Sequence, residues 1–140
     1  MASIKECRII KLPTVLDDRG RATFAAEVKD VPFDIRRVYY LYRVPRGKTR
    51  GEHAHTREKQ VIVAVSGSFD VLVDDGRRRK KIRLDDPGRG LYIPPMIWRE
   101  FHNFSKDGML LAIVDDFVDQ KEYIRDYEDF VRAASRKKRG

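Results

Sequence analysis

Short runs of hydrophobic residues alternate with turn-forming residues along most of the chain. The runs are rich in Val, Ile, Leu, Phe and Tyr, and they predict strands over residues 7–12, 22–28, 35–42, 60–65, 68–73, 79–84, 90–93, 100–103 and 109–115. Turns such as Asp18-Arg19-Gly20 and Asp74-Asp75-Gly76 separate them about every ten residues, which is typical of an all-β sandwich or barrel.

The pattern changes only near the end of the chain. There Ile124, Tyr127, Phe130 and Val131 recur at helical spacing and predict a helix over residues 121–132. We therefore expect one all-β domain over residues 1–132 that ends in a short C-terminal helix. A basic tail over residues 133–140 is expected to follow it.

Composition narrows the class of protein. The chain has 140 residues and a mass of 16.4 kDa, which is the size of one domain. Its longest apolar run, residues 61–65, is far shorter than the roughly 20 residues of a membrane helix, and the N-terminus shows no secretory segment. The single cysteine, Cys7, excludes an internal disulfide and fits a reducing compartment. We expect a cytoplasmic protein with no membrane partner.

The charge balance favours an anionic ligand. The net charge is +8 and the isoelectric point is about 9.7. The basic runs over residues 77–81 and 136–139 fall at a turn and at the chain end, and no aromatic residues interleave with them. A stacking platform for single-stranded nucleic acid is therefore missing, and we expect no nucleic acid as partner.

Two histidines carry the candidate chemistry. His53 and His55 stand two residues apart, so on an extended strand they project to the same face. Such a pair can bind a divalent metal, or one imidazole can act as an acid or base that the other supports.

The spacing around this pair resembles that of the cupin superfamily. Its first motif matches at Gly47, His53, His55, Gln60 and Gly67, and its second at Gly88, Pro94, Met96, Arg99 and Asn103. The resemblance implies a double-stranded β-helix (jelly-roll) barrel with its site in the mouth. Gln60 stands where metal-binding cupins have a glutamate ligand, and Arg99 where they have the third histidine. A guanidinium cannot ligate a cation, so we expect no metal and no cofactor, and Arg99 suits an anionic ligand instead.

A closer resemblance is to the dTDP-4-keto-6-deoxyglucose 3,4-ketoisomerases of bacterial surface-sugar pathways. It rests on segments that run from about Cys7 to Phe130: residues 36–40, 50–55, 73–76, 90–94, 98–100, 115–116 and 123–127. It implies a metal-independent tautomerisation that moves the ketone from carbon 4 to carbon 3 through an enediol. It also implies a dTDP-linked 4-keto-6-deoxy sugar as substrate and a homodimer.

The same resemblance implies roles for individual residues. His53 matches the catalytic histidine, Tyr39 matches its partner tyrosine, and His55 is the second candidate for an acid–base or orienting role. The pair Arg19-Gly20 resembles the enzymes whose product has the galacto configuration at carbon 4.

Further residues are expected to contact the substrate. Arg50 and Arg99 are candidates for the diphosphate or the sugar, and Tyr92 or Trp98 for stacking on the thymine. Three alternatives stay open: a 3,5-epimerase-like enzyme of the same fold, a non-catalytic module that binds nucleotide sugars, and a metal-dependent enzyme.

Overall fold

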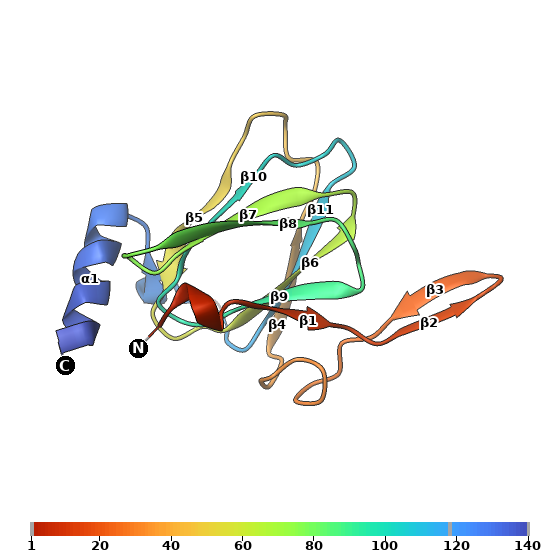
Figure 1. The fold of residues 1–140 in the computed structure, drawn as a ribbon, viewed down its shortest axis with the longest axis horizontal. Coiled ribbons are helices and arrows are strands. Elements are labelled where there is room, and N and C mark those ends of the chain that lie inside the picture. Colours follow the sequence, from red (N-terminus) through yellow and green to blue (C-terminus); the bar gives the residue numbers. More distant parts are fainter. Residues whose placement is uncertain (1, 118, 140) are drawn as a thin grey trace.

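Two antiparallel sheets face each other in the computed structural model, which describes residues 2–117 and 119–139 (Figure 1). The first sheet has the strand order β1 (Arg8–Lys11), β9 (Arg89–Ile93), β6 (Gln60–Ser66), β11 (Met109–Val114) and β4 (Arg37–Leu41). The second has the order β12 (Tyr123–Ile124), β5 (Arg50–His55), β10 (Trp98–His102), β7 (Phe69–Asp74) and β8 (Arg79–Leu84). The predicted all-β barrel of the jelly-roll type is confirmed.

The core lies between the two sheets and consists of the inward positions of their strands. Ile62 on β6 pairs with Leu91 on β9, and both side chains are fully buried. Val71 and Phe101 face them from β7 and β10. Aliphatic and aromatic side chains thus fill one part of the barrel, which leaves the polar side chains gathered near β5 and β12.

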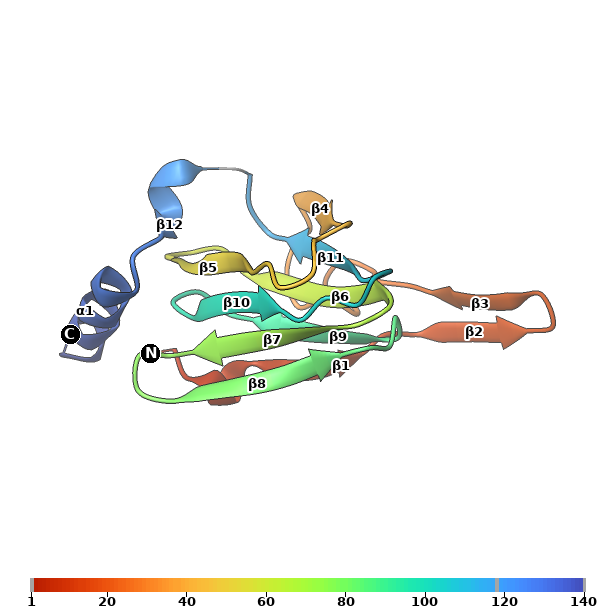
Figure 2. The ribbon, with the colours of Figure 1, turned by 90° about the horizontal axis from the view of Figure 1, so that it is seen from above.

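A two-stranded hairpin extends away from the barrel, as Figures 1 and 2 show. It consists of β2 (Thr14–Asp17) and β3 (Gly20–Thr23), and every residue of both strands is exposed. The strand expected over residues 22–28 is therefore wrong in its bounds, because strand pairing ends at Thr23 and β2 lies in a segment for which we expected no strand. Before the hairpin, a 3₁₀ turn, η1 (Ile4–Glu6), is capped by Ser3.

The C-terminal segment differs most from the expectation. A 3₁₀ turn, η2 (Gln120–Glu122), leads into β12, which pairs with β5, and the helix α1 spans Tyr127–Arg139. The helix thus begins later than residue 121 and continues through residues 133–139, which we expected to form a tail. Its buried Phe130 packs with Ala54 and Trp98 at the end of the barrel. No helix within the described part of the chain is long and apolar enough to span a membrane.

Candidate active site

Strand β5 brings the two histidines into contact. His53 Nε2 lies 3.1 Å from His55 Nε2, and the two rings meet edge to face. The backbone between them is irregular, because Glu52 has a φ of 58° and the register with β10 shifts between Arg99 and Glu100. The i, i+2 spacing predicts a shared face, and the structure places both imidazoles together on it.

Gly51 allows this close approach of β5 and β10. Its φ is +85°, and a Cβ atom there would lie 3.1 Å from the carbonyl oxygen of Arg99 and 3.2 Å from the ring of Phe101. Its own carbonyl oxygen lies 3.0 Å from His53 Nδ1. A carbonyl oxygen only accepts hydrogen bonds, so His53 Nδ1 carries a hydrogen and Nε2 is the nitrogen directed at His55.

His53 lines a cavity of about 560 Å³ between strands β4, β5, β10 and β12. The other lining residues are Arg37, Tyr39, Leu41, Thr49, Arg50, Gly51, Phe101, Tyr123 and Arg125. The wall thus combines an imidazole, two phenols and three guanidinium groups, and it suits a ligand with a polar ring and a negatively charged group. His55 lies behind His53 and is fully buried.

Arg99 is buried beneath the cavity and does not line it. Its guanidinium donates to Gln60 Oε1 at 2.9 Å and twice to the carbonyl oxygen of Ile97. Because Arg99 exposes no surface to the cavity, it cannot make the contact with a substrate that we expected from the sequence. The residue acts on the histidines through its charge instead.

Burial and the nearby Arg99 guanidinium keep the histidines neutral. Together they lower the pKa of His53 and the pKa of His55 from the usual 6.5 to about 3, with burial as the larger cause. Burial also raises the pKa of Tyr39, whose ring contacts the guanidinium of Arg37. At neutral pH the site therefore holds a neutral imidazole, which can accept a proton, beside a protonated phenol, which can donate one.

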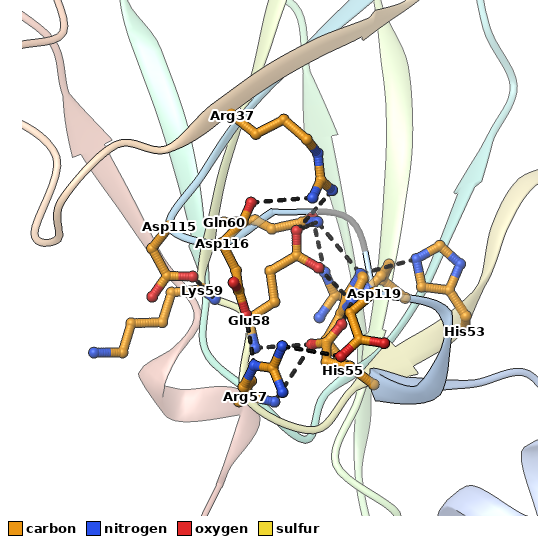
Figure 3. Close-up of polar contacts among 12 residues, drawn as sticks. Arg37, His53, His55, Arg57, Glu58, Lys59, Gln60, Asp115, Asp116 and Asp119 are labelled. Carbon is orange, nitrogen blue, oxygen red and sulfur yellow. Dashed lines mark hydrogen bonds and ion pairs between the residues drawn. The ribbon is translucent and has the colours of Figure 1, made fainter.

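Two buried carboxyl groups contact His55, and Figure 3 shows one of them, Glu58, beside it. His55 Nδ1 is 2.5 Å from Glu58 Oε2 and 2.8 Å from Glu122 Oε2, and both side chains are almost fully buried. Arg37 donates to the other oxygen of Glu58 at 2.8 Å. Burial raises the pKa of Glu58, and the Arg37 charge opposes that shift.

His55, Glu58 and Glu122 are also the residues with metal-ligand chemistry that the described part of the chain brings together. His55 and Glu122 form a hydrogen bond of 2.8 Å, and His55 Nδ1 lies 2.5 Å from Glu58 Oε2, whereas two ligands each about 2.0–2.1 Å from a zinc ion lie about 3 Å or more apart. The Arg37 and Arg99 charges nearby also disfavour a cation, so we interpret the trio as a hydrogen-bonded cluster.

Other residues expected in the site lie elsewhere. Arg19 and Gly20 lie at the turn of the β2–β3 hairpin, where Arg19 pairs with Asp17 and its side chain is 86% exposed. Tyr92 lies on β9, where it packs near Phe33 in a separate cluster. Neither the hairpin turn nor Tyr92 lines the cavity of this protomer.

Trp98 is also outside the cavity: it packs against α1 and donates its indole N–H to Glu100. Of the expected substrate contacts, Arg50 lines the cavity.

Several site residues were missed by the sequence-based reasoning. Tyr123 packs against both imidazole rings, and the Arg125 guanidinium lies 4.7 Å from the centre of its ring. Both belong to a segment that we expected to be helical, as does Glu122. The motif shared with the ketoisomerases at residues 123–127 was the available signal, although it assigned no role to these residues.

Comparison with known proteins agrees with this geometry. The family model FdtA, described as WxcM-like, C-terminal, matches residues 5–135. A TDP-4-oxo-6-deoxy-alpha-D-glucose-3,4-oxoisomerase from Aneurinibacillus thermoaerophilus is 39% identical over 125 residues, which are 89% of this chain and 90% of that protein.

Two solved structures are also similar. QdtA, a sugar 3,4-ketoisomerase from Thermoanaerobacterium thermosaccharolyticum solved with TDP, has a TM-score of 0.93 and 34% identity, and the match covers 96% of this chain and 98% of QdtA. WlaRB, a TDP-quinovose 3,4-ketoisomerase from Campylobacter jejuni, has a TM-score of 0.88 and 43% identity, with 92% and 99% covered.

The fold and the site thus define a cupin-type enzyme with one histidine, His53, at the wall of a cationic cavity and a second, His55, directly behind it. The chain belongs to the FdtA family of sugar 3,4-ketoisomerases.

Proposed function

We propose that this protein converts dTDP-4-keto-6-deoxyglucose into the 3-keto isomer without a metal. The observation that carries the proposal is the neutral His53 at the cavity wall, with Tyr39 on the neighbouring wall. The relatives named above act on TDP-linked sugars, and the three arginines of the cavity suit a diphosphate.

The reaction needs a base, an acid and a group that stabilises the enediol. The neutral His53 imidazole takes the proton from carbon 3 as the carbonyl electrons move onto the oxygen at carbon 4. Tyr39 donates a hydrogen bond to the oxygen atoms on which charge develops. The hydroxyl proton on the carbon 3 oxygen passes through Tyr39 to the carbon 4 oxygen, and His53 returns the carbon-bound proton to carbon 4, so the ketone forms at carbon 3. Arg37, Arg50 and Arg125 bind the negative charge of the substrate.

Proton NMR of dTDP-4-keto-6-deoxyglucose in deuterium oxide, with chelator-treated protein, tests this proposal. We expect a 3-keto product with deuterium at the reacting carbon, and His53→Asn should lose the activity. His102→Asn is the matched control, because His102 lies on β10 and does not line the cavity. Exchange at carbons 3 and 5 with a retained 4-keto group would instead identify an epimerase, and binding without turnover a sugar-nucleotide module.

The configuration of the product is a separate prediction. The pair Arg19-Gly20 predicts the galacto form, and the coupling constants of the product in the same spectra decide between galacto and gluco.

We further propose a homodimer in which the hairpin of one copy contacts the other. An isolated two-stranded hairpin is at best marginally stable in water, yet this one exposes Val15 at 57% and Leu16 at 65%. A second copy that covers these side chains would also bring Arg19 to a partner's site, which accounts for its position far from the cavity of its own protomer.

Mixing Arg19→Ala with the inactive variant His53→Asn tests this arrangement, with the rate of galacto-product formation as the activity that is measured, because Arg19 is assigned to the configuration of the product. If Arg19 serves the partner's cavity, co-refolded Arg19→Ala and His53→Asn proteins form mixed dimers with one intact site. The mixture should recover about one quarter of wild-type activity, because half of the dimers are mixed and half of their sites are complete. No recovery, or a monomer in analytical ultracentrifugation, would contradict the proposal.

A further inference from the structure

A continuous row of hydrogen bonds leads from the cavity to the buried carboxyl pair. It runs from the Gly51 carbonyl oxygen to His53 Nδ1 at 3.0 Å, and from His53 Nε2 to His55 Nε2 at 3.1 Å. It continues from His55 Nδ1 to Glu58 and Glu122. Of the side chains in this row only that of His53 lines the cavity, so the carboxyl groups contact the cavity wall through the imidazoles and, for Glu58, through Arg37.

The row needs one hydrogen more than two neutral imidazoles carry. One hydrogen is required between Gly51 and His53, one between the two imidazoles and one between His55 and the carboxyl pair, and each neutral imidazole has a single N–H. His53 uses its N–H at Gly51. If His55 donates its N–H to His53, the contact between His55 Nδ1 and the carboxyl groups needs a hydrogen from a carboxyl group.

The surroundings of the carboxyl pair favour a shared proton. Glu122 Oε1 accepts the backbone N–H of Glu58, and Glu58 Oε1 accepts from Arg37, so the second oxygens of both groups converge on one nitrogen. Two buried carboxylates this close disfavour double ionisation. The raised pKa of Glu58 agrees with a proton held there.

The other ionisable groups around this pair come from several neighbouring elements. They are Arg37 and Tyr39 on β4, His53 on β5, Arg99 on β10, Asp115 directly after β11 and Tyr123 on β12.

Gln60 is the competing group. Its Oε1 accepts from Arg99, so its amide N–H groups face His55 Nε2 at 3.3 Å and Glu58 Oε1 at 3.4 Å. If the amide donates to His55, the extra proton must lie on His53, which becomes an imidazolium. The low pKa of His53 argues against that state, and the experiment below distinguishes the two.

We propose that Glu58 and Glu122 are positioning residues that hold one proton between them and fix the tautomers of His55 and His53. The shared proton is donated to His55 Nδ1, so the His55 N–H lies at Nε2 and points to His53. His53 is then neutral, with its hydrogen on Nδ1 and a lone pair on Nε2 that accepts the His55 N–H; this hydrogen bond must break before Nε2 takes a substrate proton. The single negative charge of the pair also stabilises the imidazolium that forms when His53 takes a substrate proton. The proposal rests on the proposed function only where it names His53 as the base.

Kinetics of the isosteric variants Glu58→Gln and Glu122→Gln test the role of the pair. An amide keeps the shape of the side chain but holds no transferable proton. We expect kcat to fall about 10- to 100-fold with KM changed less than about threefold, and the double variant to be little worse than the worse single one, because the pair acts as a unit. Asp115→Asn is the matched control, since Asp115 accepts a backbone N–H from Lys59 outside the row. Additive losses, or a loss in KM alone, would contradict the proposal.

Nitrogen-15 NMR locates the proton without any change to the row. The chain has three histidines, so a His102→Asn background leaves only His53 and His55. We expect two neutral imidazoles at pH 7, with the hydrogen on Nδ1 of His53 and on Nε2 of His55, and the same tautomers in Glu122→Gln, because its Oε1 still accepts the Glu58 N–H and its amide group then donates to His55 Nδ1. An imidazolium at His53 would overturn the proposal. These spectra need no substrate, so they still test the proton assignment if the protein fails to isomerise the sugar.

Discussion

Lowering the pH from 8 to 5 should destabilise the wild-type protein more than a His53→Asn variant. The folded state holds the pKa of His53 at about 3, whereas the unfolded chain returns it to about 6.5. Below pH 6.5 the unfolded state therefore binds the additional proton, and the free energy of unfolding falls as the pH falls. At pH 5, which is 1.5 pH units below 6.5, the contribution of His53 is about 2 kcal/mol, at about 1.36 kcal/mol per unit.

The difference between the two proteins isolates this contribution. His55 titrates in the same sense as His53, but the raised pKa of Glu58 acts in the opposite sense, so the wild-type curve alone mixes several groups. Subtracting the variant cancels the groups that both proteins share. Urea unfolding at pH 8, 7, 6 and 5 measures the difference, with His102→Asn as the control for removing a histidine outside the cavity. Parallel curves for wild type and His53→Asn would refute the reasoning and place a charged His53 in the folded site.

Three further substitutions test other parts of the structure. Tyr39→Phe should lower kcat about 100-fold or more with little change in KM, measured by steady-state isomerisation. Arg99→Met removes the charge that lowers the pKa of His53, so the acidic limb of the kcat profile should move to higher pH. Gly67→Ala should cost about 2 kcal/mol or more in urea unfolding, because φ there is +58° and a Cβ would lie 2.9 Å from the Cα of Gly108; unchanged stability would contradict the close packing.

The sequence predicted the inner strands well, because both hydrophobicity and turns mark them. The expected segments 60–65, 68–73 and 79–84 differ from β6, β7 and β8 by at most one residue at an end. The C-terminal helix was placed too early because Ile124 fits the helical stripe in sequence, but it pairs as a strand with Ala54. The local hydrophobic pattern of this segment fits either a helix or a strand, and its pairing with β5 makes it a strand.

The site was predicted only where its residues are close together in the sequence. His53 and His55 stood out by their spacing, whereas a lone glutamate such as Glu122 carries no signature. Arg99 was assigned to the ligand because residue type alone does not tell which side of the cavity wall a side chain occupies. Its complete burial, and the hydrogen bond to Gln60 on the opposite sheet, follow from the packing of β10 against that sheet.

The contact between His55 and Glu122 also constrains when the enzyme becomes competent during its synthesis. These residues are 67 positions apart, and at about 5–20 residues per second the ribosome adds the second one roughly 3–13 s after the first. During that interval the nascent barrel lacks the strand β12 and the carboxyl group that His55 requires. The order of translation therefore delays the contact between His55 and Glu122 until this later segment has docked, so a partly made copy already has its histidine pair but lacks the carboxyl group that contacts it.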